Sequence, residues 1–357
     1  MKILTIAGTR PELIRLSVIL KKLDNRCDHK FLWTGQNYTP ELSGNFFKEF
    51  DIREPNYRKS DIQAFAGPTG LSEQLASHFI GAENAIRNFR PDKALILGDT
   101  NSALTAIVCE RMGVPVFHME AGNRCHDWRV PEEQNRRVID AVSSWALPYT
   151  PGSRDNLLAE GIPRARIKMC GNPIYEVIEA NRHRIPGRRF DNDYFLATFH
   201  RQENVDNRER LHQIFLGLTA VARFHDAEVF CSVHPRTRQK IDDFGLEMGN
   251  YSDRIRLFAP FGFADFLSLE RNALGVFTDS GTVQEECCLF RIPTVTIRDS
   301  TERPETVDCG SNIVSGLNPE NMHACMLEML KRDDDWAFPS GYREPNVSER
   351  VLEILDV

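Results

Sequence analysis

Acidic side chains in the first half of the chain stand at positions where an enzyme could use them as acids and bases. Asp99 and Glu120 each follow a short apolar run, and Glu132 lies at the start of a segment with helical spacing. The carboxyl ends of parallel strands share one edge of a sheet, so these carboxylates are expected to converge. Arg136 stands four residues after Glu132, on the same helical face. Carboxylates beside a cation are typical of proton transfer, and a surface ion pair between Glu132 and Arg136 is the simpler alternative.

A stretch in the second half of the chain, residues 278–305, is suited to hold a phosphate. It follows an apolar run that reads as a buried strand, and the small residues Ser280, Gly281 and Thr282 lie just before a helix expected from residue 283. The N–H groups at a helix start and the small side chains before it let a phosphate approach the backbone. For these residues alone, an ordinary tight turn is an equal alternative.

Two charged residues extend this site. Glu286 would repel a phosphate, so we expect it to accept hydrogen bonds from a sugar diol such as that of a ribose. Arg303 stands between two acids on the following loop. The whole stretch therefore favours a nucleoside-diphosphate site.

Further candidate binding residues lie after other predicted strands. Arg10 follows the first strand and could instead be a solvated surface arginine. His200 follows a later strand, and its charged neighbours favour a site residue over a core histidine. Phe266 could stack on a base, although most of the phenylalanines near it are expected in the core. The remaining candidates for substrate binding are Arg15, Gln36 and His234. Gln36 could equally have a structural role in its turn.

A sustained alternation of strands and helices must position these side chains. Apolar runs predict strands in the first half at residues 2–7, 29–34, 93–97, 115–118, 146–150 and 166–170. In the second half they predict strands at residues 194–198, 228–233, 254–258, 274–277 and 293–297. Helical spacing is expected from residues 11, 131 and 283 onward and over residues 71–88, 101–112, 153–161, 175–181, 322–330 and 347–355.

This order predicts an α/β protein with two doubly wound, Rossmann-like domains that face a central cleft. The first, residues 1–180, would carry the catalytic carboxylates, and the second, residues 190–340, would bind the nucleotide. The basic segment 182–193 reads as the linker. Residues 341–357 are expected to form a helix that packs near the domain boundary.

The composition of the chain argues against several classes of partner and cofactor. The chain of 357 residues is 41% hydrophobic and 27% charged, with a formal net charge of −7, so nucleic acid and anionic membranes are not expected partners. The nine cysteines form no Cys-x-x-Cys pair, which argues against a metal site. The chain shows no signal peptide and no membrane-length apolar run, so reduced thiols and a cytoplasmic location are expected.

Seven motifs in order resemble those of the non-hydrolysing UDP-N-acetylglucosamine 2-epimerase family over nearly the whole chain. They are GTRPE at residues 8–12, GDT at 98–100, HMEAG at 118–122, PEEQNR at 131–136, HRQEN at 200–204, DSGT at 279–282 and TERPE at 301–305. The family usually has lysine at position 15, where this chain has arginine.

The resemblance implies a glycosyltransferase-B-like fold and a homodimer that acts on a UDP-N-acetylhexosamine. The sugar would lie between the domains, with its diphosphate near Arg10 and His200, and His200 would join the three carboxylates as a catalytic candidate. No dinucleotide-binding fingerprint is present, so no cofactor is expected. The C2 hydrogen of the sugar is not acidic, and the family route is elimination of UDP to 2-acetamidoglucal followed by re-addition. Which carboxylate is the base stays open.

Some features depart from the family pattern. Gly281-Thr282 replaces the common Gly-Gly, the loop at residues 123–131 is short, and residues 35–38 and 122–125 resemble a branch that acts on 6-deoxy or otherwise modified sugars. That branch includes enzymes of UDP-N-acetyl-L-fucosamine synthesis in capsule and O-antigen pathways. The alternatives are a hydrolysing epimerase that releases N-acetylmannosamine and UDP, a glycosyltransferase of the same fold, and a non-catalytic nucleotide-sugar binder.

Overall fold

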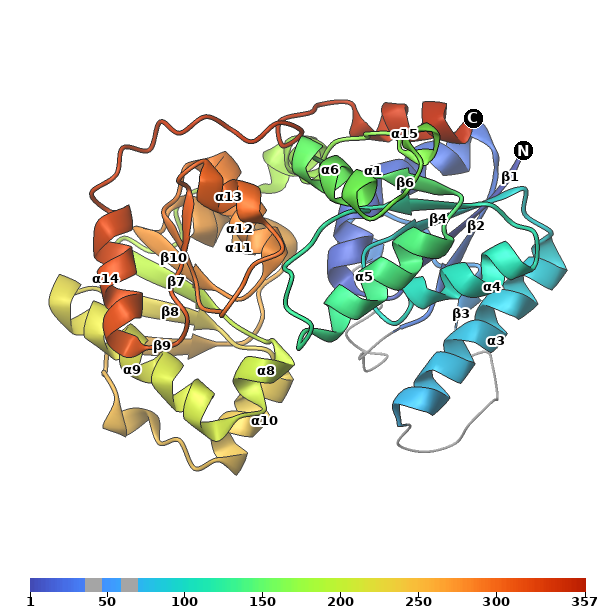
Figure 1. Cartoon of the computed structure of the whole chain (residues 1–357). Coiled ribbons are helices and arrows are strands. Elements are labelled where there is room, and N and C mark those ends of the chain that lie inside the picture. The colour runs from blue at the N-terminus through green and yellow to red at the C-terminus, as the bar shows by residue number, and fades with distance from the viewer. Residues whose placement is uncertain (36–46, 59–69) are drawn as a thin grey trace. The chain divides into compact units, whose positions relative to one another are not determined.

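The structure is a computed structural model that describes residues 1–35, 47–58 and 70–357. It divides into two compact units (Figure 1). Unit 1 comprises Met1–Ala180 and Ser340–Val357, and unit 2 comprises Asn181–Pro339. The candidate Gln36 lies outside the described residues.

Unit 1 is built on a six-stranded parallel sheet with the order β3-β2-β1-β4-β5-β6. Its strands are β1 (Lys2–Ala7), β2 (Asp28–Trp33), β3 (Tyr57–Arg58), β4 (Lys93–Leu97), β5 (Val116–Met119) and β6 (Trp145–Leu147). Its helices are α1 (Arg10–Arg26), α3 (Leu71–Phe89), α4 (Ala106–Arg111), α5 (Pro131–Val142), α6 (Pro151–Ala159), α7 (Ile174–Asn181) and α15 (Val347–Leu355).

Unit 2 repeats this plan with the order β12-β11-β10-β7-β8-β9. Its strands are β7 (Tyr194–Thr198), β8 (Glu228–Ser232), β9 (Ile255–Phe258), β10 (Gly275–Thr278), β11 (Thr294–Thr296) and β12 (Asn312–Val314). Its helices are α8 (Gln202–Val205), α9 (Arg208–His225), α10 (Pro235–Asp243), α11 (Phe263–Arg271), α12 (Gly281–Phe290), α13 (Pro304–Asp308) and α14 (Pro319–Met329).

Helices cover both faces of the sheet in unit 2. Phe195 and Ala197 of β7 pack into one apolar cluster, which also contains residues of α9 and α14. Tyr194 and Leu196, whose side chains point the other way, pack into a second cluster with residues of α11 and α12. Parallel strands need this double cover, and it explains why they read as continuous apolar runs rather than as alternating ones.

The order of strands reverses once in each sheet, and this determines where a ligand can bind. In unit 1 the reversal lies between β1 and β4, and in unit 2 it lies between β7 and β10. Connections leave to opposite faces at such a point, which opens a crevice beyond the carboxyl ends of the strands. The loops after these four strands carry the GTRPE, GDT, HRQEN and DSGT motifs.

The carboxyl-terminal helix belongs to unit 1. Helix α15 packs against α1, as Figure 1 also shows, and Glu349 forms ion pairs with Lys22 at 2.8 Å and with Arg26 at 2.9 Å. No helix in the described ranges is long and apolar enough to cross a membrane.

Some helices and strands were predicted incorrectly or were not predicted. The strand expected at 166–170 does not form, because a 3₁₀ turn at Arg164–Arg166 leaves only a single bridge between Ile167 and Ala146. Helix α12 begins at Gly281, two residues before the predicted start, because Ser280 already has the extended backbone of a cap. Helix α9 and strand β12 were not among the predicted elements.

Candidate active site

Glu120 occupies an unusual backbone position directly after β5. Its φ is 69°, in the left-handed region that a residue with a side chain adopts at a cost of roughly 1 kcal/mol or more. Arg15 of α1 donates to Oε2 of Glu120, and Asn123 donates to Oε1 at 3.4 Å. Both members of the Arg15–Glu120 ion pair are buried. The guanidinium of Arg15, a predicted substrate contact, therefore holds a predicted catalytic carboxylate.

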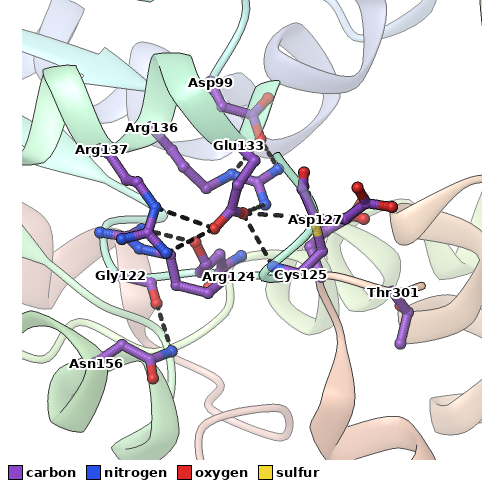
Figure 2. A network of polar contacts seen from close by, with 12 residues as sticks. Asp99, Gly122, Arg124, Cys125, Asp127, Glu133, Arg136, Arg137, Asn156 and Thr301 are labelled. Atoms are coloured by element: carbon purple, nitrogen blue, oxygen red, sulfur yellow. Dashed lines mark hydrogen bonds and ion pairs between the residues drawn. The ribbon is translucent and has the colours of Figure 1, made fainter. Parts of the chain in front are cut away.

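Asp99 lies after β4 and is held by Arg136. Nη2 and Nε of Arg136 donate to Oδ2 of Asp99 at 2.5 and 3.1 Å, while Nη1 donates to Glu133 at 2.9 Å (Figure 2). Arg136, which shares a helical face with Glu132, is thus bonded to the neighbouring Glu133 and to Asp99 at a separate strand end. Glu132 is half-buried in the first turn of α5.

Glu133 is the centre of this network and was missed as a site residue. Besides Arg136 it accepts hydrogen bonds from Arg137 at 3.0 Å and from the backbone N–H of Cys125 at 3.0 Å (Figure 2). Burial acts to raise the pKa of Glu133, but the Cys125 N–H and the two guanidinium groups outweigh it and hold the pKa below its usual range. Glu133 therefore stays charged and orients the arginine that holds Asp99.

A second buried network holds the loop that follows Glu120. Asp140 of α5 accepts from His118 at 2.8 Å, from the backbone N–H of Gly122 at 3.0 Å and from Arg124 at 2.8 Å. Burial raises the pKa of Asp140, but the hydrogen bonds and charges of His118 and Arg124 lower it by more. A charged Asp140 thus ties the HMEAG loop to α5.

Glu12 joins the loops after β1 and β4 and was also missed. Its Oε2 accepts from the N–H groups of Gly8 and Thr9 at 2.6 and 3.0 Å, and its Oε1 accepts from Thr100 at 2.7 Å. Burial raises the pKa of Glu12 to about 7 despite these three donors. The spacing Thr9-x-x-Glu12 before an apolar helix is a capping box, which could have identified it from sequence.

Arg10 lies in the same loop region as the first residue of α1. It is half-buried, and its guanidinium approaches Glu49 at 3.9 Å. Of the predicted residues in unit 1, Asp99, Glu120 and Arg10 thus lie at the carboxyl ends of β4, β5 and β1, which are neighbours in the sheet.

In unit 2 the DSGT motif forms the start of α12. Ser280 occupies the N-cap position without a side-chain capping bond, and the first turn carries no acidic residue, because Glu285 and Glu286 lie further along α12. Gly281 has no room for a side chain, because a Cβ there would lie 2.8 Å from Oε1 of Glu302. A helix N-terminus with small residues and no acid in its first turn suits an anion.

Asp279, directly after β10, positions the predicted His200. Its buried carboxylate accepts from the N–H groups of His200 and Arg201 at 3.1 and 3.0 Å and from Asn204 at 3.0 Å. The His200 side chain is 49% exposed. His234 caps α10 nearby, and burial followed by the charge of His200 lowers the pKa of His234.

Arg303, predicted as a substrate-binding residue, is buried inside unit 2. Its Nε donates to Glu285 of α12, and its Nη1 donates to the carbonyl of Glu302 at 3.2 Å. Glu302 in turn accepts from Arg201 at 2.7 Å and from Arg298 at 2.5 Å. The TERPE loop is thus bonded to α12 and to the loop that carries His200.

Both residues predicted to contact the nucleoside are shielded from solvent, one partly and one almost fully. Phe266 is half-buried and packs against the apolar cluster that contains Tyr194 and Phe230. Glu286 on α12 is only 4% exposed.

The chemistry open to these residues is proton transfer and anion binding. Among the residues described, no group of three His, Cys, Asp or Glu is placed to hold a metal ion, and the cysteines are free thiols.

Comparison with known proteins gives consistent matches over the whole chain. A family profile described as UDP-N-acetylglucosamine 2-epimerase matches residues 21–356. The UDP-N-acetylglucosamine 2-epimerase of Methanocaldococcus jannaschii is 37% identical, with 99% of each chain covered. The UDP-2,3-diacetamido-2,3-dideoxy-D-glucuronate 2-epimerase of Pseudomonas aeruginosa is 35% identical, with 99% of this chain and 100% of the relative covered.

The fold matches a solved structure equally well. The crystal structure of the M. jannaschii enzyme in complex with UDP-GlcNAc and UDP aligns with a TM-score of 0.92 at 36% identity, covering 100% of this chain and 99% of that one. This match and the two parallel sheets confirm the predicted α/β, glycosyltransferase-B-like fold class.

Proposed function

Because the chain belongs to the UDP-N-acetylglucosamine 2-epimerase family, we propose that it inverts C2 of a UDP-N-acetylhexosamine without net hydrolysis. The proposal goes beyond membership of an epimerase family in two respects. It names the non-hydrolysing outcome, and it assigns roles to residues of this chain.

The observation that carries the proposal is the set of buried or half-buried carboxylates at the strand ends of unit 1. Asp99 and Glu120 follow adjacent strands, and each is held by its own arginine, Arg136 and Arg15. Groups that move protons must be fixed in orientation, and these ion pairs supply that. Glu132 in the first turn of α5 completes the proposed set.

We assign the nucleotide to unit 2. The start of α12 at Ser280, Gly281 and Thr282 would take the diphosphate, and Glu286 would accept from the ribose diol. His200, His234 and Arg10 would lie near the leaving diphosphate and stabilise its charge. Phe266 would contact the base.

The proposed reaction has two balanced halves. A carboxylate takes the proton from C2 while the bond between C1 and the diphosphate oxygen breaks, which yields 2-acetamidoglucal and UDP. A second acid then delivers a proton to the opposite face of C2 while the diphosphate oxygen adds back to C1. The route needs two acid–base groups and no change of oxidation state.

We infer that the substrate is UDP-N-acetylglucosamine or a close derivative. The two relatives act, by their names, on UDP-N-acetylglucosamine and on a diacetamido glucuronate sugar. The product would supply surface-polysaccharide synthesis in the cytoplasm. We also expect a homodimer, which light scattering after gel filtration would test.

Incubation with a panel of UDP-N-acetylhexosamines in D₂O, followed by NMR, tests the function directly. We expect the C2 epimer, with deuterium at C2 and no added nicotinamide cofactor. Accumulation of free N-acetylhexosamine and UDP would identify a hydrolysing enzyme instead. Epimer that keeps all of its original C2 hydrogen would rule out the elimination route.

A further inference from the structure

Glu270 is a completely buried acid that the proposed reaction does not use. It lies on α11 with 0% exposure, and neither of its carboxyl oxygens has a hydrogen-bond partner of ordinary length among the described residues. Its chain neighbours Leu269 and Ala273 belong to an apolar cluster, together with Cys287 of α12. An unpartnered carboxyl in such a place requires an explanation.

The carboxyl of Glu270 must be neutral in these surroundings. Transfer of an unpaired carboxylate into an apolar interior is so costly that the group keeps its proton instead. Burial, and then the neighbouring Glu286, raise the pKa of Glu270 well above its ordinary value. A neutral carboxyl has one O–H to donate, which a carboxylate lacks.

Glu286 is the acceptor that faces Glu270. Helix α11 packs against α12, and Glu286 lies on α12 about one and a half turns beyond Gly281. Glu286 is close enough to Glu270 for its charge to raise the pKa of that carboxyl. Because Glu286 is nearly buried itself, a donor beside it would determine which way its second oxygen points.

We propose that Glu270 is a positioning residue, whose protonated carboxyl donates to Glu286 and holds that carboxylate ready for the vicinal diol of a ribose. The inference rests on the proposed function, because it assumes that α12 binds a nucleotide. It adds a residue from another helix to the recognition of the ribose.

The inference makes Glu270→Met and Glu270→Gln behave differently. Methionine fits an apolar site but cannot donate, so we expect a higher melting temperature together with roughly tenfold weaker UDP binding, the scale of one charge-assisted hydrogen bond. Glutamine can still donate an N–H to Glu286, so we expect UDP binding close to that of the wild type. Cys287→Ala is the matched control, because it disturbs the same interface and leaves both carboxyl groups in place.

The decisive measurement is calorimetric binding of UDP and of 2′-deoxy-UDP to the full-length protein and its variants. The ratio of the affinity for UDP to that for 2′-deoxy-UDP should fall towards one in Glu270→Met and in Glu286→Gln. The same ratio should stay at its wild-type value in Glu270→Gln and Cys287→Ala. The double variant Glu270→Met/Glu286→Gln should lose no more of this preference than Glu286→Gln alone, because Glu270 acts through Glu286.

Infrared difference spectra of wild type against Glu270→Gln at pH 7 give a second readout that does not depend on the methionine variant folding. They should contain the carbonyl stretch of a protonated carboxyl. Its absence, or a ribose preference unchanged in Glu270→Met, would overturn the inference alone. A wild-type protein that binds no UDP would overturn the proposed function and the inference with it.

Discussion

At the scale of single residues, several carboxyl groups share one sheet edge but differ in their surroundings. Asp99 and Glu120 are paired with arginines, whereas Glu12 is buried among neutral donors. An ion pair favours the charged form of a carboxyl, and burial favours the neutral one. Burial accordingly raises the pKa of Glu12.

Glu12 should give the protein a pH-dependent stability. Burial raises its pKa to about 7 from the ordinary 4.5, so its contribution to stability is complete below about pH 4.5 and is lost as the pH rises towards 7. The loss should be about 3 kcal/mol, since one pKa unit corresponds to about 1.4 kcal/mol. Glu12→Gln cannot titrate, so its free energy of unfolding relative to wild type should rise over this range.

Denaturant unfolding of both proteins between pH 4.5 and 8 measures this effect. Thr100→Val is the control, because it removes one donor to Glu12 but keeps the titrating carboxyl, and it should retain the pH dependence. A constant difference between wild type and Glu12→Gln at all pH values would contradict the argument.

Cys309 should be the most reactive thiol at neutral pH. Its Sγ lies 3.9 Å from that of Cys288, and the hydrogen bond from Cys288 lowers the pKa of Cys309 to about 6. The thiolate is the nucleophile, so iodoacetamide at pH 7 should modify Cys309 before the similarly half-buried Cys325, whose pKa is raised by burial. Peptide mass spectrometry measures the order. Cys288→Ala should slow the reaction at Cys309, and equal rates in both proteins would refute the assignment.

At the scale of elements, each candidate site depends on where a helix begins. Helix α1 begins at Arg10, α5 at Pro131 and α12 at Gly281, and each follows a loop from a strand's carboxyl end or from the HMEAG motif. Loops held between a strand and a helix start keep their side chains in one place. The buried networks around Asp140, Glu133 and Asp279 serve the same purpose from inside.

The start of α12 should not tolerate a larger residue. In Gly281→Ala the new Cβ would meet Glu302, which cannot move freely because Arg201 and Arg298 bind it. Overpacking of this kind costs roughly 1–3 kcal/mol, so we expect lower stability and weaker UDP binding. Gly249→Ala, where a Cβ meets nothing, is the control. Unchanged thermal stability and UDP affinity in Gly281→Ala would show that Glu302 can shift without cost.

For the molecule as a whole, the proposed catalytic groups and the proposed nucleotide site belong to different units. The carboxylates Asp99, Glu120 and Glu132 belong to unit 1, and α12 belongs to unit 2. Substitutions of the unit 1 carboxylates should therefore lower turnover, whereas substitutions on α12 should weaken nucleotide binding.

Asp99→Asn, Glu120→Gln and Glu132→Gln should each lower turnover by about 10²-fold or more, the usual scale for a positioned acid or base. UDP affinity should stay near the wild-type value, because unit 2 is unchanged. Steady-state kinetics and calorimetry on the same samples test the separation. Glu120→Gln leaves Arg15 buried without its anionic partner, so its thermal stability must be checked as well. Parallel losses of turnover and UDP affinity in Asp99→Asn would place the nucleotide partly on unit 1.

The sequence alone determined the fold class and the family, because both depend on local patterns. Apolar runs that alternate with segments of helical spacing predict the strands of a parallel sheet, and this pattern can be read without knowing the tertiary contacts. The motifs follow those runs, so their place at the carboxyl ends of β1, β4, β5, β7 and β10 could be predicted.

Only the tertiary structure decided which charges meet. Arg136 bonds Glu133 and Asp99, and neighbouring positions on a helix point about 100° apart, so helix rotation against the sheet selects the partner. The burial of Arg303 and of Glu270 likewise depends on helices that pack from distant parts of the chain. Sequence spacing specifies the face of an element, whereas packing determines what that face contacts.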